Sequence, residues 1–428
     1  MSGPQALQRV LYRSAKQDPA RRFHAVYHHV GRIDILWQAW SAVRANHGAP
    51  GIDGLTIEAV EESGVGTFLT ELSEALRAGT YRPSPLRRVR IPKPGQPGKT
   101  RPLSIPVLRD RVAMAAAKIV LEPVFEADFM PCSFGFRPKR SAHMANEAIR
   151  VEANRGANWV LDADVSDCFG SIDHDALMSQ VARRVSDREM LKLLRAWLRV
   201  GVFEDGVITD SVSGTPQGSP ISPLLANIAL HVLDEAWAAT SGLGVLVRYC
   251  DDFVILCASR ARAEEARRRV MAILATLGLK LHPDKTRIAC LTQGEQGFVF
   301  LGFHHHKVES RKWRGRFYLQ RWPSPRAMAS VRGKVRDLTD RSHVGWPIEA
   351  VVWKLNQVLK GWANFFCHGN SGEMFGAIDS YVHLRMALFA SKKHGISGSN
   401  WARRFDGAWL LSLGVYRLRP TVRGSAHA

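Results

Sequence analysis

A pair of adjacent aspartates inside an apolar segment constrains this chain more than any other feature. Tyr249-Cys250-Asp251-Asp252 lies between the apolar runs Val245–Val247 and Phe253–Ala258. Val, Ile, Tyr and Phe favour strands and Asp interrupts them, so we predict a β-hairpin with its carboxylates at the turn. Adjacent carboxylates on an apolar hairpin repel each other and lose hydration, and a divalent cation such as Mg²⁺, which takes hard oxygen ligands, would compensate them. A solvated Asp-Asp turn is the alternative interpretation.

A second acidic segment lies upstream. Residues 159–169 (WVLDADVSDCF) predict a buried strand that runs into a helix. Asp162 and Asp164 share one face of that strand, because side chains on a strand repeat every second residue. If the strand and the hairpin lie side by side, Asp164, Asp251 and Asp252 could hold two metal ions, which suits in-line displacement at phosphorus. Asp162 is interpreted as a supporting or structural carboxylate.

The order of motifs along the chain strongly resembles that of a reverse transcriptase. Asp164 is followed five residues later by Phe169, and then come GTPQGSPISPLLAN at 214–227, YCDD at 249–252, LHPDKT at 281–286 and FLGF at 300–303. Within that family the chain looks most like the bacterial group II intron-encoded type, whose proteins also act as splicing maturases. The narrower resemblance rests on GAPGIDG at 48–54, YRPSP at 81–85 and SFGFRP at 133–138. It extends from about Arg32 to Leu418.

The resemblance implies an α/β (α+β) right-hand polymerase with fingers, palm and thumb. The palm sheet is expected to be antiparallel, and a helical thumb and maturase (domain X) region is expected to follow it. We expect an N-terminal helical extension over residues 1–50, fingers and palm over 51–303, thumb and maturase over 304–390, and a basic tail over 391–428. No His-Asn-His nuclease signature follows. Any DNA cleavage during mobility is therefore expected from the intron RNA, or is bypassed by priming at replication forks.

By resemblance, Asp164, Val165, Asp251 and Asp252 would bind two Mg²⁺ ions, with Mn²⁺ as a possible substitute. Lys285 would protonate the departing pyrophosphate, and an ammonium there lowers the barrier by charge even without proton transfer. A surface ion pair between Lys285 and its neighbour in the sequence, Asp284, is the alternative.

Four residues are candidates for binding the incoming dNTP. Lys93 and Arg101 flank a Gly/Pro loop and match the fingers cations that hold the triphosphate; a basic hairpin on the template backbone is the alternative. Gln217 lies in a turn where an amide can hydrogen-bond the sugar or base, although Pro216 and Gly218 could simply end a strand. The ring of Phe169 would collide with a 2′-hydroxyl and so select dNTP over NTP, or it could be plain core.

Three further residues match the family's primer and template contacts: Tyr249, Cys250 and Gly302. Cys250 departs from the family pattern, in which alanine is most common. Cysteine has a similar size, so we expect polymerase function to survive. The sequence His304-His305-His306 could suggest a metal site, but only His304 and His306 would share a strand face, and strand polarity is the preferred interpretation.

The remaining local patterns predict helices. Residues 263–277 are expected to form one, with Arg267, Arg268 and Arg269 on a solvated face. A basic helix over 326–341 would suit a thumb on a template–primer duplex. Residues 353–366 place apolar side chains at helical spacing and resemble the maturase region, which in the family binds intron RNA.

Composition points to a polyanionic partner. The 428 residues include 59 Lys and Arg against 39 Asp and Glu, a formal charge of +20, and nucleic acid suits such an excess better than a membrane surface. No apolar run is long enough to span a membrane, and the first residues lack the apolar core of a signal peptide. The six cysteines are scattered without a Cys-x-x-Cys pair and are interpreted as reduced thiols. A cytoplasmic location is expected.

The predicted function is that of an RNA-directed DNA polymerase that extends a primer with dNTPs and assists splicing and mobility of its group II intron. Its expected partners are an RNA template, the intron RNA, a DNA primer or target, and dNTPs. Three alternatives stay open: a splicing cofactor with dispensable polymerase activity, a reverse transcriptase recruited to defence or repair, and an RNA-dependent RNA polymerase. The sequence leaves the oligomeric state undetermined.

Overall fold

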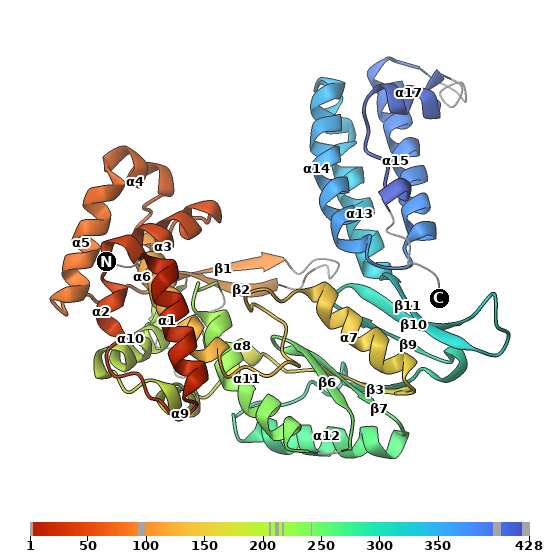
Figure 1. Cartoon of the computed structure of the whole chain (residues 1–428). Coiled ribbons are helices and arrows are strands. Elements are labelled where there is room, and N and C mark those ends of the chain that lie inside the picture. The colour runs from red at the N-terminus through yellow and green to blue at the C-terminus, as the bar shows by residue number, and fades with distance from the viewer. Residues whose placement is uncertain are drawn as a thin grey trace. The chain divides into compact units, whose positions relative to one another are not determined.

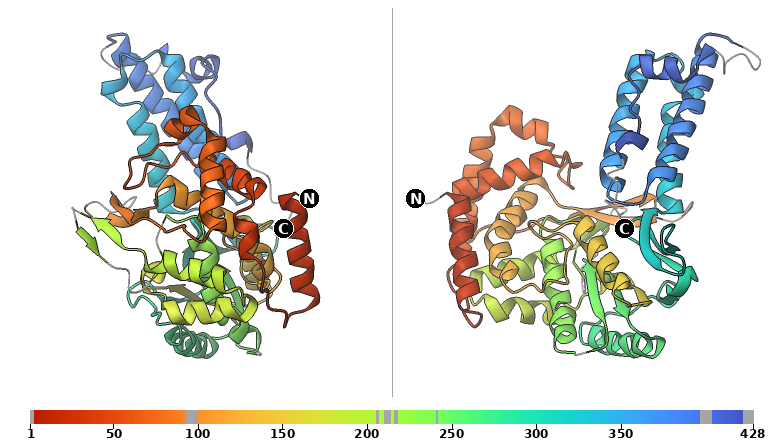
Figure 2. Two further views of the ribbon diagram at one scale, coloured as in Figure 1. Left: turned by 90° about the vertical axis from the view of Figure 1, so that its left-hand side faces the viewer. Right: turned by 45° about the vertical axis from the view of Figure 1, so that its right-hand side comes forward.

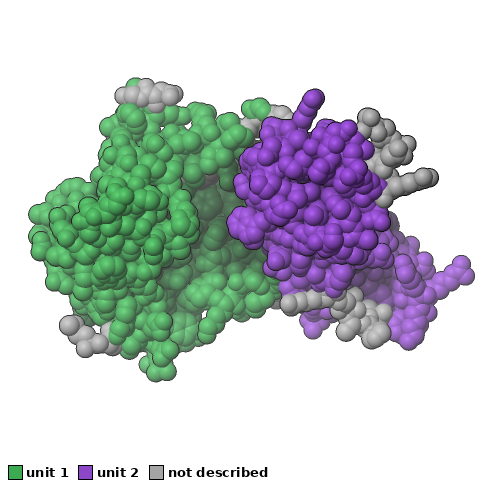
Figure 3. Space-filling view, turned by 90° about the horizontal axis from the view of Figure 1, so that it is seen from above, with its two compact units in different colours: residues 1–93, 98–145, 160–288 green, residues 94–97, 146–159, 289–428 purple. Residues whose placement is uncertain are grey.

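The structure, a computed structural model, describes residues 3–92, 98, 100–204, 207–209, 214–215, 218–240, 242–396 and 404–421 of the chain. Two compact units are distinguished in Figure 3. Unit 1 comprises residues 1–93, 98–145 and 160–288, and unit 2 comprises residues 94–97, 146–159 and 289–428. In the described part of the chain, no helix is both long and apolar enough to cross a membrane.

Helices dominate the first part of unit 1 (Figure 1): α1 (Pro4–Gln17), α2 (Tyr27–Val30), α3 (Ile33–Ala45), α4 (Ile57–Ser63), α5 (Val65–Arg77) and α6 (Leu108–Glu126). Helix α6 is buried over most of its length. Its small side chains Ala113, Ala116 and Ala117 are fully buried, which lets α1 and α3 pack closely against it.

Unit 1 also contains a four-stranded sheet with the order β2-β1-β4-β5. Its strands are β1 (Leu86–Pro92), β2 (Thr100–Ile105), β4 (Val202–Glu204) and β5 (Val207–Thr209). Strands β1 and β2 are antiparallel and pair from Arg87 with Ile105 to Pro92 with Thr100. Strand β4 joins β1 in the parallel direction.

The second sheet of unit 1 has the order β6-β7-β3-β8. Its strands are β3 (Trp159–Asp164), β6 (Val245–Tyr249), β7 (Asp252–Cys257) and β8 (Arg287–Cys290), the last of which ends across the boundary of the unit. Every residue of β7 from Phe253 to Cys257 is buried, so both faces of this strand are covered. The remaining helices of unit 1 are α8 (Cys168–Ser171), α9 (His174–Arg184), α10 (Arg188–Arg199), α11 (Ser222–Ala238) and α12 (Arg260–Ala275).

Helix α12 packs against β7 and begins at the N-cap Ser259, whose hydroxyl accepts from the Arg262 amide. Arg267, Arg268 and Arg269 are exposed on it, as predicted, and both Arg268 and Arg269 pair with Glu265. These charges stabilise the outer face of α12 only modestly, because exposed ion pairs in a helix contribute a few tenths of a kcal/mol each.

Unit 2 begins with most of α7 (Ala142–Asn154) and continues with a three-stranded antiparallel sheet of order β11-β10-β9. Its strands are β9 (Gly297–Phe300), β10 (Phe303–Glu309) and β11 (Phe317–Pro323). The predicted strand faces of the histidine run are confirmed: the rings of His304 and His306 stack on one face at 5.9 Å, whereas His305 is fully buried on the other. The His305 Nε2 atom lies 2.8 Å from the Asn146 amide oxygen.

The rest of unit 2 is helical: α13 (Pro325–Leu338), α14 (Ile348–Phe366), α15 (Gly372–Lys393) and α17 (Gly407–Ser412), with short 3₁₀ turns at Thr292–Gly294, Arg341–His343 and Arg419–Thr421. Helices α13 and α14 confirm the two helices predicted over residues 326–341 and 353–366. Leu355 and Leu359 of α14 and Phe375 of α15 are fully buried in one apolar core. The three long helices are seen together in the right-hand view of Figure 2.

Candidate active site

The Asp251–Asp252 hairpin is formed as predicted. Strands β6 and β7 are antiparallel, Tyr249 pairs with Asp252, and Cys250 and Asp251 make a two-residue turn. Cys250 has a φ of 59°, in the left-handed region that tight hairpin turns require. Because the apolar strands on either side are buried, the turn has a fixed position at the end of the sheet.

Strand β3 lies directly beside β7 in the sheet and carries the second acidic pair. Ala163 is buried, whereas Asp162 and Asp164 on the other face are half-buried, as the strand period predicts. The backbone of β3 is fixed from its other side, because the His282 amide donates to the Asp164 carbonyl at 2.8 Å and Val165 forms a bridge with Leu281. Neighbouring strands thus bring carboxylates from positions almost 90 residues apart into one region.

The carboxylates of this region influence one another. Partial burial, and then the negative charges of Asp251, Asp164 and Asp162, raise the pKa of Asp252 to about 6, although Asp252 keeps contact with solvent. Burial is also the main cause that raises the pKa of Asp162 to about 6 and the pKa of Asp251 above its ordinary value. Concentrated negative charge of this kind favours binding of cations.

Two basic side chains partly neutralise the cluster. The Lys285 ammonium donates to Asp164 Oδ2 at 2.7 Å, and the Arg287 Nε donates to Asp162 Oδ2 at 3.3 Å. Lys285 therefore pairs with Asp164, 121 residues away, and not with its neighbour Asp284, which was the alternative partner in the sequence. Both pairs are partly exposed, so each contributes little to stability.

The donor set fits a hard divalent cation, since it consists of carboxylate oxygens. Among the described residues, however, no three His, Cys, Asp or Glu side chains are grouped so that they could hold a metal ion. The strands bring Asp164, Asp251 and Asp252 into mutual influence, but the Asp164 carboxylate is turned toward Lys285. Like charges repel, so each carboxylate is most stable beside an available cation. The assignment of the three aspartates as metal ligands stays a prediction.

The structure describes two of the four candidates for binding the incoming dNTP. Lys93 and Gln217 lie outside the described residues. Arg101 is exposed on β2 opposite Ile91, and Phe169 is half-buried in α8, with its carbonyl accepting the Thr215 amide.

Two candidate primer contacts lie at hairpin turns. Tyr249 precedes the acidic turn, with its ring centroid 6.1 Å from that of Phe136. Gly302 belongs to unit 2 and forms the β9–β10 turn with Leu301; their φ values of 81° and 48° are both in the left-handed region.

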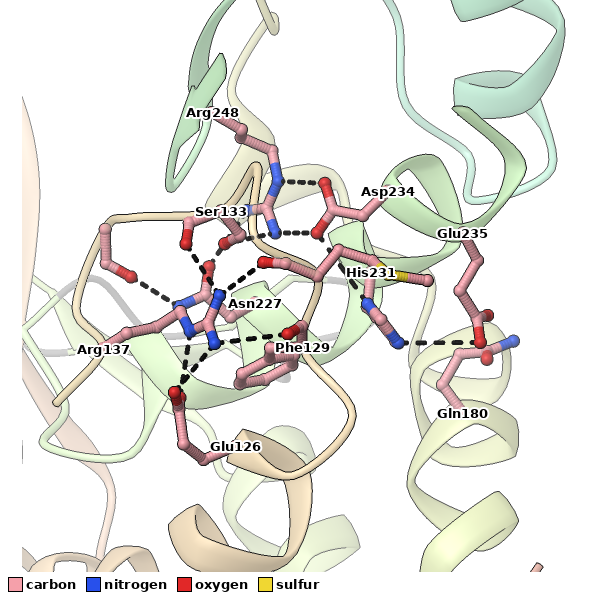
Figure 4. A network of polar contacts seen from close by, with 12 residues as sticks. Glu126, Phe129, Ser133, Arg137, Gln180, Asn227, His231, Asp234, Glu235 and Arg248 are labelled. Atoms are coloured by element: carbon pink, nitrogen blue, oxygen red, sulfur yellow. Dashed lines mark hydrogen bonds and ion pairs between the residues drawn. The ribbon is translucent and has the colours of Figure 1, made fainter. Parts of the chain in front are cut away.

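A buried polar network behind the turn was missed by the sequence reasoning (Figure 4). Arg248 of β6 is fully buried and donates to Asp234 of α11 through Nε at 2.8 Å and Nη2 at 2.5 Å. It also donates to Asn227 Oδ1 at 3.0 Å, to Ser133 Oγ at 2.9 Å and to the Cys250 carbonyl at 2.9 Å. Although burial opposes ionisation, the guanidinium lowers the pKa of Asp234, so both groups are charged.

This network explains the SFGFRP motif. Ser133 forms a parallel bridge with Arg248, the Phe134 amide donates to the Arg248 carbonyl at 2.8 Å, and the Asn227 amide donates to the Gly135 carbonyl at 2.8 Å. A Cβ on Gly135 would lie 2.8 Å from the Tyr249 carbonyl carbon, so only glycine fits there. Arg248 inside the apolar run VLVRY was the signal that sequence reasoning could have used, because a charge in a buried strand needs a partner.

Comparison with known proteins shows the family of the chain. Residues 91–305 match the family Reverse transcriptase (RNA-dependent DNA polymerase), and residues 328–407 match Group II intron, maturase-specific domain. The chain is 33% identical to protein YkfC of Escherichia coli (strain K12) over 345 residues, which cover 71% of the chain and 89% of YkfC.

A second relative is the group II intron-encoded protein LtrA of Lactococcus lactis subsp. cremoris, which is 37% identical over 215 residues. That alignment covers 50% of the chain but 35% of LtrA. The putative COX1/OXI3 intron 1 protein of Saccharomyces cerevisiae is 26% identical over 398 residues, covering 80% of the chain and 45% of that protein. The chain thus spans less than half of the length of these two relatives.

Proposed function

Since the chain belongs to the reverse transcriptases of the group II intron type and is an RNA-directed DNA polymerase with a maturase-specific domain, we propose how its own residues carry out the reaction. The observation that carries the proposal is that β3 and β7 are neighbours in the sheet, so that the charges of Asp162 and Asp164 contribute to the raised pKa of Asp252. Asp164, Asp251 and Asp252 are proposed as the ligands of two Mg²⁺ ions, for which Mn²⁺ could substitute, with the Val165 carbonyl as an additional ligand.

Bound there, the ions would supply charge stabilisation to the attacking 3′-oxygen and to the leaving pyrophosphate. The fold would hold these proposed ligands in place, because Asp251 lies on a turn where the neighbouring Cys250 carbonyl accepts a hydrogen bond from Arg248, and Asp164 ends a strand bonded on both sides. Rigid placement matters since reacting atoms must be held in near-attack geometry.

Lys285 is proposed to act on the leaving group. Its ammonium lies 2.7 Å from Asp164, so it is already in the acidic region, and it would be released from that carboxylate when Asp164 binds a cation. A released ammonium can stabilise the departing pyrophosphate and donate a proton to it.

The incoming dNTP is proposed to contact Arg101 and Lys93 through its triphosphate and Gln217 through its sugar or base. Phe169 would exclude a ribose 2′-hydroxyl, which selects dNTP. RNA template, DNA primer or target, and the chain's own intron RNA are the proposed nucleic acids, in agreement with the charge of +20. The cytoplasm is the proposed place of action.

Primer extension on an RNA template tests the proposal. We expect wild-type protein to incorporate dNTPs into acid-insoluble product and Asp251→Asn to lose about a thousandfold in rate, as removal of roughly 4 kcal/mol of charge stabilisation implies. Asp162→Asn is the matched control, because Asp162 lies on the same strand face as Asp164 but is not a proposed ligand. A wild type that incorporates no dNTP, or equal loss in the two variants, would contradict the proposal.

A further inference from the structure

The connection between β10 and β11 in unit 2, residues 310–316, is an ordered hairpin tip (Figure 1). The Glu309 carboxylate accepts the Gly315 amide at 2.7 Å. The Ser310 hydroxyl accepts the amides of Lys312 and Trp313 at 3.3 and 3.2 Å, and the Ser310 amide donates to the Arg316 carbonyl at 2.7 Å. These bonds hold the tip in one shape, so little conformational entropy would be lost if it bound a partner.

The tip presents four cations and one aromatic ring. Arg311, Lys312, Arg314 and Arg316 are all exposed, and within the described residues none of them forms an ion pair. Trp313 is 42% exposed. The Lys312 Nζ and the Arg316 Cζ lie 4.9 and 5.8 Å from the centre of its ring. Such a ring at a hairpin tip does not contribute to a core, and the cations beside it repel one another.

We propose that this tip, residues 310–316, binds single-stranded RNA, with an unpaired base stacked on Trp313 and the adjoining phosphates bound by its cations. The inference rests on the proposed function, in which the chain binds RNA, and names one surface that does so. Stacking on an aromatic ring requires an unpaired base, and the unpaired cations match the phosphates. An acidic peptide would pair with the cations but would give Trp313 no base to stack on.

Helix α12 offers a comparison inside the same chain. Arg268 and Arg269 are also exposed, but both pair with Glu265, at 2.6 and 2.8 Å. Removing these two charges changes the net charge of the protein as much as removing Arg314 and Arg316 does. A difference between the two double variants would therefore reflect position and not bulk charge.

Binding of a labelled single-stranded RNA to the full chain, followed by fluorescence anisotropy at several salt concentrations, tests the inference. We expect Trp313→Ala to weaken binding about tenfold and Trp313→Phe to restore most of it, because stacking is retained. Arg314→Ser/Arg316→Ser should lower the salt slope by about 1.4, since each phosphate that the protein neutralises on a single strand adds roughly 0.7 to that slope. Arg268→Ser/Arg269→Ser should bind nearly as wild type does, and thermal unfolding checks that every variant is folded.

The outcomes separate this inference from the proposed function. If wild type binds no RNA, both are contradicted. If wild type binds RNA and the Trp313 and Arg314/Arg316 variants bind equally well, or the α12 variant weakens binding as much, the tip is not the binding surface and the proposed function is untouched. Equal dependence on Trp313 with a perfectly paired duplex would contradict stacking, since its bases are not available.

Discussion

Arg248 connects the acidic turn to the helix behind it through five hydrogen bonds, so its replacement should affect both stability and the turn. Arg248→Met would leave the buried Asp234 carboxylate without its partner, which costs about 3–5 kcal/mol. That is a large share of the roughly 5–15 kcal/mol by which a domain is stable. We therefore expect the single variant to be poorly folded.

The double variant Arg248→Met/Asp234→Leu separates folding from positioning. It removes both buried charges, which is often neutral for stability, yet it still lacks the hydrogen bond to the Cys250 carbonyl. A hydrogen bond from a charged group contributes about 1.5–3 kcal/mol, so local opening of the turn should become about 10- to 100-fold more frequent.

The reactivity of the Cys250 thiol provides a measure of that opening. The thiol is buried, and burial raises its pKa to about 12, so it reacts only when the turn opens. We expect iodoacetamide to alkylate Cys250 about 10- to 100-fold faster in the double variant, measured by mass spectrometry of its peptide. Cys257, fully buried at the far end of β7, is the control and should keep its wild-type rate. Unchanged protection of Cys250, or a parallel rise at Cys257, would refute the positioning role of Arg248.

Three further changes have defined outcomes. Gly135→Ala should lower primer-extension activity more than about tenfold with a smaller loss of thermal stability, because a Cβ would press on the backbone at Tyr249; normal activity would show that the turn tolerates displacement. Phe169→Val should raise the incorporation of NTPs in the same assay at least about tenfold, and an unchanged preference for dNTPs would indicate that Phe169 is only a core residue. Burial lowers the pKa of His305 from 6.5 to about 3, so the unfolded chain binds more protons between these pH values. The contribution of neutral His305 to the free energy of unfolding is complete above about pH 6.5 and falls by about 1.4 kcal/mol per pH unit below it. Urea midpoints at about pH 7 and 5 should therefore differ more in wild type than in His305→Phe, and equal differences would contradict this expectation.

Local patterns were sufficient for much of the fold. Apolar runs interrupted by Asp predicted the hairpin at Asp251, and strand periodicity predicted the shared face of Asp162 and Asp164 and the opposite faces of His304 and His305, because it depends on neighbouring residues. Apolar residues at helical spacing likewise predicted the helix over 353–366, and the helix over 326–341 was predicted as a basic one, to which the structure adds the Ser324 cap.

Contacts between distant positions could not be predicted in the same way. The partner of Lys285 was open in the sequence, where Asp284 is adjacent, and the fold selected Asp164 because β3 and the segment after Leu281 are joined by backbone bonds. The Arg248–Asp234 pair was missed since it links a strand to a helix, and no local periodicity records such a pairing. The order of the strands in each sheet is likewise a property of long-range packing.

The central claim, that the aspartates of β3 and β7 together bind paired divalent ions, is tested most directly by counting bound Mn²⁺ by electron paramagnetic resonance. The protein would carry a template–primer ending in a dideoxynucleotide and the next dNTP. Two Mn²⁺ ions per wild-type chain are predicted, with fewer in Asp164→Asn and in Asp251→Asn and no loss in Asp162→Asn. The same number of bound ions in all four proteins would contradict the account.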